Sequence, residues 1–280
     1  LNDQYVLQND INNLYKWSLE NRMTFHPDKC KVLPVTLQRN VLDNLPFNIF
    51  CYELNGTIVD YASDHTDLGV IINARSTWGL HCDTLVAKAS TNLAILKRTC
   101  HFATNQRQKR AFYLAVVRSL LEHCSVVWSP QHAKHINKFA AVQRRAIKWI
   151  LGDQHCSYSD DEFDQKQRSL NILPIKLKLI YNDLVMFYKI VNCLVPISLP
   201  DYISIIQPED TRYTRSSASI HNQADRSRYQ CNVPINNDTF KNSYFCRVIR
   251  FWNSVPETIR QTEGISAFKS LLLRYIWSPE

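Results

Sequence analysis

Two adjacent aspartates offer the most direct route to metal-dependent chemistry in this sequence. Asp160 and Asp161 follow Tyr158 and Ser159, and paired carboxylates can hold two metal ions that stabilise the attacking and leaving oxygens of a nucleotidyl transfer. Such a pair needs apolar strands on both sides, so that the carboxylates project from a tight hairpin. Polar residues flank this pair instead and predict the start of a helix, where the helix dipole favours acidic side chains. We therefore interpret Asp160 and Asp161 as a decoy without a catalytic role.

A second candidate is half of a zinc site. His132 and His135 have a spacing that suits zinc, and Cys124 or His123 could add a ligand. The ordinary alternative is two polar residues at a helix start, and we prefer it. The nine cysteines form no CxxC pair, which argues against both a zinc ribbon and a disulfide framework. We predict no metal site in this chain.

Other catalytic motifs are missing from the sequence. It contains no GxSxG or HExxH, and no GxGxxG or GxxxxGK[ST] phosphate loop, in keeping with only 5 glycines. The residues themselves therefore support no enzyme activity. The chain also lacks a signal peptide and any run of about 18 uncharged apolar residues. We expect an intracellular protein that is neither secreted nor bound to a membrane.

Positive charge is concentrated in one part of the chain. Residues 76–150 hold twelve Lys and Arg against two acids, a net charge of +10, whereas the whole chain carries +8. An excess this one-sided repels itself unless a polyanion relieves it, and a phosphate backbone is the usual partner. A solvated basic face without a partner is the alternative. We interpret the region as a site for RNA or DNA.

A helix over residues 133–151 would present much of this charge. Its apolar positions include Ile136, Ala140, Ile147 and Ile150, and a basic stripe falls on the opposite side. Gly152 is suited to end the helix. The basic residues that we assign to nucleic-acid binding here and in the preceding segments are Lys97, Arg98, Arg107, Lys109, Arg110, Lys134, Lys138, Arg144, Arg145 and Lys148.

The remaining patterns predict an α+β fold that is mostly helical. Asn55-Gly56 predicts a hairpin, and short strands are expected at Cys30–Leu37 and Leu68–Ile72. Residues 200–235 are rich in Pro, Ser, Asn and Asp and predict a loop-rich connector. Helical periodicity covers 4–22, 85–100, 111–128, 165–170, 176–191, 240–252 and 265–277.

An ordered series of short motifs resembles the carboxyl-terminal part of the reverse transcriptases of non-LTR retrotransposons, of the LINE or jockey-like kind. The series runs along almost the whole chain, and each motif alone is short. Its main members are Phe25–Cys30, Asp67–Val70, Tyr113–Arg118, Val127–Pro130, Val142–Ala146, Leu173–Ile175, Phe187–Ile190 and Phe251–Pro256.

The resemblance implies an organisation that periodicity does not show. Residues 1–75 would be the end of the palm with a small β-hairpin, 76–152 the helical thumb that tracks a primer–template duplex, and 153–280 a helical carboxyl-terminal region. Lys29 matches the lysine of the family's fourth polymerase motif, which acts on the pyrophosphate leaving group. Leu68, Gly69 and Val70 match the primer grip, a hairpin that holds the primer end.

The resemblance also implies where the chemistry lies. The catalytic aspartates of the family precede Lys29 in the palm, so we expect an RNA-directed DNA polymerase fragment that binds nucleic acid and does not polymerise alone. The two Mg ions, and the upstream palm and fingers, would belong to the complete polyprotein, in a nuclear or cytoplasmic ribonucleoprotein. Two alternatives stay open: a stand-alone basic nucleic-acid-binding protein derived from a retrotransposon, and a non-functional pseudogene product.

Overall fold

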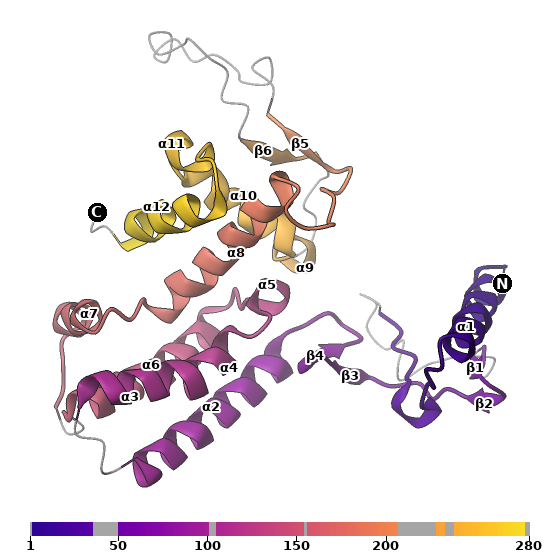
Figure 1. Ribbon diagram of the computed structural model, residues 1–280, viewed down its shortest axis with the longest axis horizontal. Coiled ribbons are helices and arrows are strands. Elements are labelled where there is room, and N and C mark those ends of the chain that lie inside the picture. Colours follow the sequence, from indigo (N-terminus) through magenta and orange to yellow (C-terminus); the bar gives the residue numbers. More distant parts are fainter. Residues whose placement is uncertain are drawn as a thin grey trace. The chain divides into compact units, whose positions relative to one another are not determined.

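Helices dominate the computed structural model of the chain (Figure 1), which describes residues 2–35, 50–100, 105–153, 156–206, 228–232 and 238–277. The fold is α+β and mostly helical, as predicted, and the strands in these ranges form three antiparallel pairs. The chain divides into two compact units, Leu1–His81 and Cys82–Glu280. The boundary expected at 75 lies six residues before the observed one, and residues 82–152 and 153–280 belong to a single unit.

The first unit begins with the predicted helix, α1 (Asn2–Glu20), followed by the 3-10 turn η1 (Pro27–Lys29). The predicted hairpin is confirmed: β1 (Glu53–Leu54) pairs with β2 (Thr57–Ile58). Asn55 and Gly56 have φ of 54° and 72°, the left-handed values that a two-residue turn needs. The strand expected at Cys30–Leu37 is reduced to a single bridge between Val32 and Tyr61, and residues 36 and 37 lie outside the described ranges.

A second hairpin stands where a continuous strand was predicted from Leu68. Strand β3 (Asp64–Asp67) pairs with β4 (Val70–Asn73). Leu68 and Gly69 form the turn, with φ of 47° and 83°. The strand prediction was wrong at these two residues because leucine seldom adopts a positive φ and its apolar side chain suggests a strand. The Leu68 side chain is 84% exposed at the tip of the hairpin.

The second unit consists mainly of helices, several of which lie side by side (Figure 1). The predicted apolar face of Leu85, Ala89, Leu93 and Leu96 is buried. The continuous helix expected over 111–128 is wrong, because Cys124 has a φ of 51° and interrupts it. The helical segments are α2 (Gly79–Thr99), α3 (Gln106–Phe112), the π-helix η2 (Tyr113–Arg118), α4 (Ser119–Glu122), α5 (Ser125–Trp128), α6 (Ala133–Leu151), α7 (Asp160–Ser169), α8 (Ile175–Val191), α9 (Asp238–Lys241), α10 (Tyr244–Ser254), α11 (Glu257–Arg260) and α12 (Ile265–Trp277).

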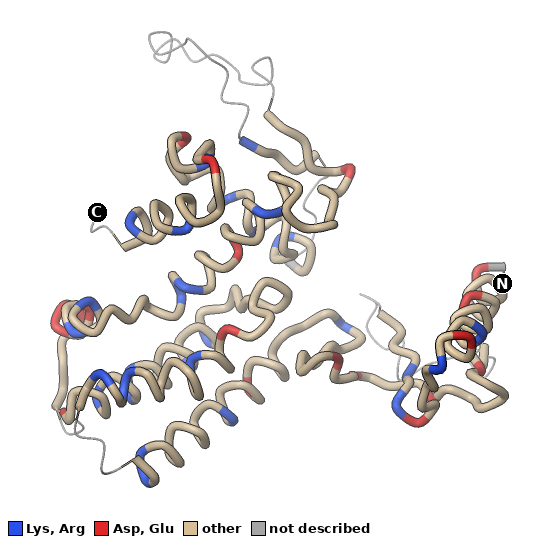
Figure 2. Tube along the Cα trace, viewed as in Figure 1, with Lys and Arg blue, Asp and Glu red and all other residues tan. Residues whose placement is uncertain are grey.

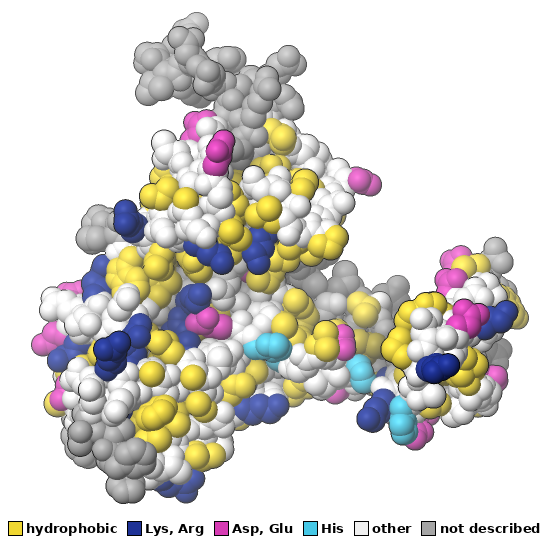
Figure 3. Space-filling model, in the orientation of Figure 1, with side chains coloured by type: hydrophobic (Ala, Val, Ile, Leu, Met, Phe, Trp, Pro, Cys, Tyr) yellow, Lys and Arg dark blue, Asp and Glu magenta, His cyan; other side chains and the backbone are white. Residues whose placement is uncertain are grey.

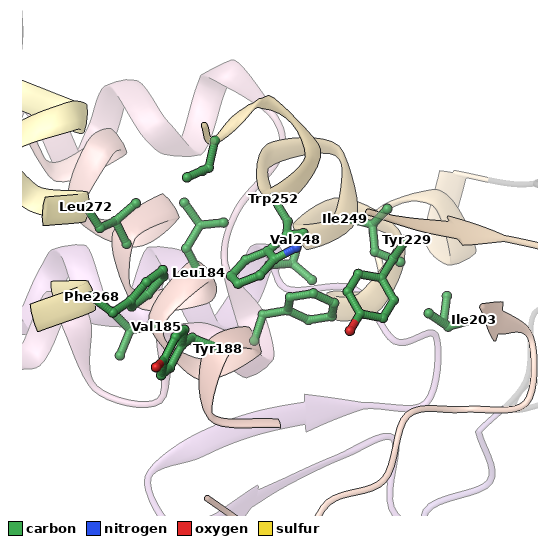
Figure 4. Close-up of a cluster of buried hydrophobic side chains, with 12 residues drawn as sticks. Leu184, Val185, Tyr188, Ile203, Tyr229, Val248, Ile249, Trp252, Phe268 and Leu272 are labelled. Carbon is green, nitrogen blue, oxygen red and sulfur yellow. The ribbon is translucent and has the colours of Figure 1, made fainter. Parts of the chain in front are cut away.

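An aromatic core joins α8, α10 and α12 (Figure 4). The rings of Tyr188 and Phe268 stack with centroids 4.1 Å apart, and Phe187 meets Trp252 edge-on at 5.0 Å. The loop-rich connector predicted at 200–235 contributes to this core through a strand pair that the prediction missed, β5 (Ile203–Ile205) with β6 (Tyr229–Cys231). Its residues 207–227 and 233–237 lie outside the described ranges.

Buried polar contacts join helices of the second unit that are separated in the sequence. The guanidinium of Arg247 binds the carboxylate of Asp183 through two hydrogen bonds of 2.9 and 3.1 Å, and it also donates to the carbonyl of Val126. The Gln143 amide on α6 donates to Gln167 Oε1 on α7 at 2.8 Å. Buried polar groups without partners are costly inside a protein. These contacts therefore stabilise the packing of α10 against α8 and α5, and of α6 against α7.

Candidate nucleic-acid interface

Helix α6 is the main carrier of basic residues in the second unit (Figure 2). It ends at Gly152, whose φ of 84° and N–H bonds to the last carbonyls confirm the predicted carboxyl-terminal cap. Ile147 and Ile150 are fully buried as predicted, whereas Ala140 is exposed and was wrongly assigned to the apolar face. The helix buries one face and turns Lys134 and Arg145 to solvent.

Two side chains of α6 link it to α2. Lys138 Nζ lies 2.6 Å from Asp83 Oδ1, and Arg145 Nη2 donates to Ser90 Oγ at 2.9 Å. Asp83 and Ser90 are seven residues apart on α2, and Lys138 and Arg145 are seven residues apart on α6. The two helices therefore run parallel over two turns. Asp83 and Ser90 could not be predicted as partners from the sequence, because tertiary packing sets the register of α2 against α6.

The basic residues of α6 differ in whether their partners are acidic or neutral, and this decides how much of their charge remains for a phosphate group. Lys138 is neutralised by Asp83, whose carboxyl pKa is lowered by the hydrogen bond from Lys138. Arg144 is neutralised by Asp160 at 2.9 Å. In contrast, Arg145 donates to Ser90 Oγ and to the carbonyl of Ala141, which are uncharged acceptors. These hydrogen bonds orient the Arg145 guanidinium without cancelling its charge.

Lys97 and Lys148 extend the uncompensated charge around Arg145. Partial burial lowers the pKa of Lys97, and the positive charge of Arg145 lowers it further. Lys97 lies in the last turn of α2, the helix that Arg145 contacts through Ser90. Lys148 Nζ donates to the carbonyl of Cys156 at 2.5 Å, again a neutral partner. We call Lys97, Arg145 and Lys148 the basic cluster. A bound anion would relieve its repulsion.

Arg110 and Lys109 make contacts outside the basic cluster. Arg110 donates to the carbonyls of Leu170 and Asn171 at 2.6 and 2.9 Å, a structural role that the sequence did not indicate. Lys109 lies 5.8 Å over the ring of Trp149. Arg98 and Arg107 are exposed, near the end of α2 and the start of α3. On the face drawn in Figure 3, basic side chains are interleaved with apolar and acidic ones.

The residues assigned to polymerase motifs lie in the first unit. Lys29 closes the turn η1 and is exposed. Leu68 and Gly69 form the turn of the β3–β4 hairpin, and Val70 begins β4 as a buried residue. The chain thus has a hairpin at the position where the resemblance implies one, although its turn falls inside the segment that was expected to be a strand.

The paired aspartates lie at the start of a helix, as predicted. Ser159 is the N-cap of α7 and exchanges hydrogen bonds with Glu162 in a capping box. Asp160 is 95% exposed and pairs with Arg144. His135 is 3.6 Å from Asp83. Within the described part of the chain, no three His, Cys, Asp or Glu side chains gather as a metal site would require.

Comparisons with protein-family models, curated proteins and solved structures found no match to this chain. Every helix in the described ranges is too short or too polar to span a lipid bilayer.

Proposed function

We propose that this chain is the carboxyl-terminal part of a non-LTR retrotransposon reverse transcriptase, and that its second unit binds primer–template nucleic acid through the basic cluster. The observation that carries the proposal is that Arg145 and Lys148 donate to neutral acceptors, Ser90 Oγ and the Cys156 carbonyl, whereas their neighbours Lys138 and Arg144 pair with acids. Guanidinium and ammonium groups held by neutral acceptors keep their full charge for phosphate oxygens. Contacts of this kind position a duplex without reading its sequence.

The first unit supports the proposal in two ways. Its β3–β4 hairpin lies at the residues that resemble the primer grip. In addition, α1 leaves large apolar side chains in solvent, with Val6 54%, Leu14 50% and Trp17 47% exposed. An upstream palm and fingers of the same polyprotein would cover such side chains. Those segments would also supply the catalytic aspartates and the two Mg ions.

The salt dependence of binding tests the proposed interface. We would measure the affinity for a fluorescent RNA–DNA primer–template by anisotropy over a range of salt concentrations. Each phosphate contact contributes about 0.9 to the slope of log affinity against log salt. The double variant Arg145→Gln, Lys148→Gln should therefore lower the magnitude of this slope by about 2, because both side chains keep neutral partners.

A matched control removes the same formal charge from the same helix. Lys138→Gln with Arg144→Gln takes away two cations that Asp83 and Asp160 already neutralise. The slope of this control should fall by less than about 1. Equal slope changes for the two double variants would contradict the assignment of the basic cluster, since net charge alone would then explain binding.

A primer-extension assay tests the polymerase part of the proposal. With Mg and nucleotides, the chain alone should bind primer–template without extending it, and fusion to an intact palm should allow extension. Efficient synthesis by the chain alone would refute the proposed division of roles. A stand-alone nucleic-acid-binding protein would show the same salt dependence, without any gain of synthesis from an added palm.

A further inference from the structure

Two cysteines from different elements meet in the second unit. Cys231 ends β6 and Cys246 lies in the first turn of α10, with the two Sγ atoms 4.0 Å apart. The strand is anchored on the same helix by Asn253, which accepts from the N–H of Tyr229 at 3.1 Å and donates to its carbonyl at 2.8 Å. The pairing of β6 with α10, rather than a chance side-chain rotamer, therefore brings the two thiols together.

We propose that Cys231 and Cys246 form a reversible intramolecular disulfide when the protein is exposed to a peroxide. A disulfide requires an S–S distance of about 2.05 Å, so the sulfurs must approach by about 2 Å. The oxidised state would reach that distance through side-chain rotation and backbone adjustment. The proposal concerns the carboxyl-terminal core and is independent of the proposed nucleic-acid binding.

The chemistry balances with hydrogen peroxide as the oxidant. The thiolate of the first cysteine attacks one peroxide oxygen, the O–O bond breaks, and a sulfenic acid and water result after protonation. The second thiol then attacks the sulfenic sulfur, forms the S–S bond and releases a second water. Two thiols lose two electrons and two protons in total, and one peroxide is reduced to two waters.

Burial decides the order of the two cysteines. Cys246 is 4% exposed, whereas Cys231 is only half-buried. The oxidant therefore reaches Cys231 first, and Cys246 is the resolving thiol beneath it. Burial also raises the pKa of the Cys246 thiol, which keeps it protonated and protected from direct oxidation.

The disulfide would fasten the β5–β6 pair to the helical core. Ile203 of β5 pairs with Cys231 and belongs to the buried cluster around Trp252. The loop closed by the bond spans 15 residues from one cysteine to the other. A cross-link over a loop of this size restricts the unfolded chain and stabilises the folded one.

Mass mapping of the oxidised protein tests the proposal. The folded chain would be treated with equimolar hydrogen peroxide, blocked with N-ethylmaleimide in denaturant and digested with trypsin, which cleaves at Lys241 between the two cysteines. We expect a linked peptide pair containing Cys231 and Cys246 that dithiothreitol separates. The Tm of the oxidised protein should rise by roughly 5 °C.

Serine variants supply the controls. Cys231→Ser should abolish both the linked peptides and the rise in Tm, whereas Cys193→Ser, at an exposed cysteine, should leave both unchanged. If Cys231 and Cys246 were both recovered with N-ethylmaleimide while the exposed cysteines were oxidised, the proposal would be overturned. That result is readable in the wild-type protein alone, so it does not depend on whether a variant folds.

Discussion

Replacing Arg247 with methionine would leave Asp183 as a buried carboxylate without a counter-ion. Both side chains are 1% exposed and are joined by hydrogen bonds of 2.9 and 3.1 Å. Breaking a buried ion pair from one side costs about 3–5 kcal/mol, because the remaining charge stays desolvated. Arg247→Met also removes the donor to the Val126 carbonyl. We therefore expect the free energy of unfolding of the second unit to fall by about 4 kcal/mol.

The loss of stability caused by Arg247→Met should depend on whether the Asp183 carboxylate remains. In the double variant Asp183→Leu, Arg247→Met both charges are gone, and the loss should shrink to about 1–2 kcal/mol. Arg250→Met on the same helix is the matched control. Arg250 is exposed and donates a long hydrogen bond, of 3.4 Å, to the carbonyl of Lys241, so its replacement should cost less than about 0.5 kcal/mol.

Urea denaturation followed by circular dichroism would measure these differences. For a unit of this size, a loss of 3–5 kcal/mol also lowers Tm by roughly 6–20 °C. The reasoning would fail if Arg247→Met cost less than about 1 kcal/mol, or if the double variant were as unstable as the single one. Either outcome would mean that the Asp183 carboxylate is not desolvated in solution.

Three further predictions concern local features. Ser159→Ala removes the capping box with Glu162 and should destabilise α7, lowering the free energy of unfolding by about 1 kcal/mol in urea. Leu68→Asn relieves the positive φ of 47° in the second hairpin and should raise the stability of the first unit by about 0.5–1 kcal/mol, read from its melting curve. Burial raises the pKa of the Cys82 thiol from its ordinary 9.0 to about 12. The folded state then holds this proton more tightly, so the contribution to stability is complete below about pH 9 and is lost as the pH rises towards 12. Urea curves between about pH 8 and 11 should show a steeper decline for wild type than for Cys82→Ala, and parallel declines would contradict the assignment.

Local sequence patterns correctly predicted elements whose conformation is determined by the residues of the element itself. Asn55-Gly56 specified a two-residue turn, because both residues accept a positive φ. Leu68-Gly69 forms the same kind of turn and was missed, since nothing about leucine indicates it. The apolar spacing from Leu85 to Leu96 predicted a buried helix face, and the helix has one. The break at Cys124, directly before α5, has a φ of 51° and no comparable local signal in the sequence.

The basic surface was predicted less completely than the helices that carry it. Counting charges located the excess in residues 76–150, but could not tell which cations meet an acid. Lys138 and Arg144 are neutralised by Asp83 and Asp160, which lie 55 and 16 residues away in the chain. Such pairings depend on tertiary register, so Arg145 could be distinguished from Arg144 only in the folded protein.

The Arg247 contacts couple regions that are far apart in sequence. Through Asp183 and the Val126 carbonyl, one guanidinium joins α10 to α8 and α5. Transient opening of α10 must therefore break contacts of the same body that carries α6. A polyanion bound at α6 would stabilise that whole body by mass action. Amide hydrogen exchange in α10 should consequently slow on binding, although α10 carries no residue of the basic cluster.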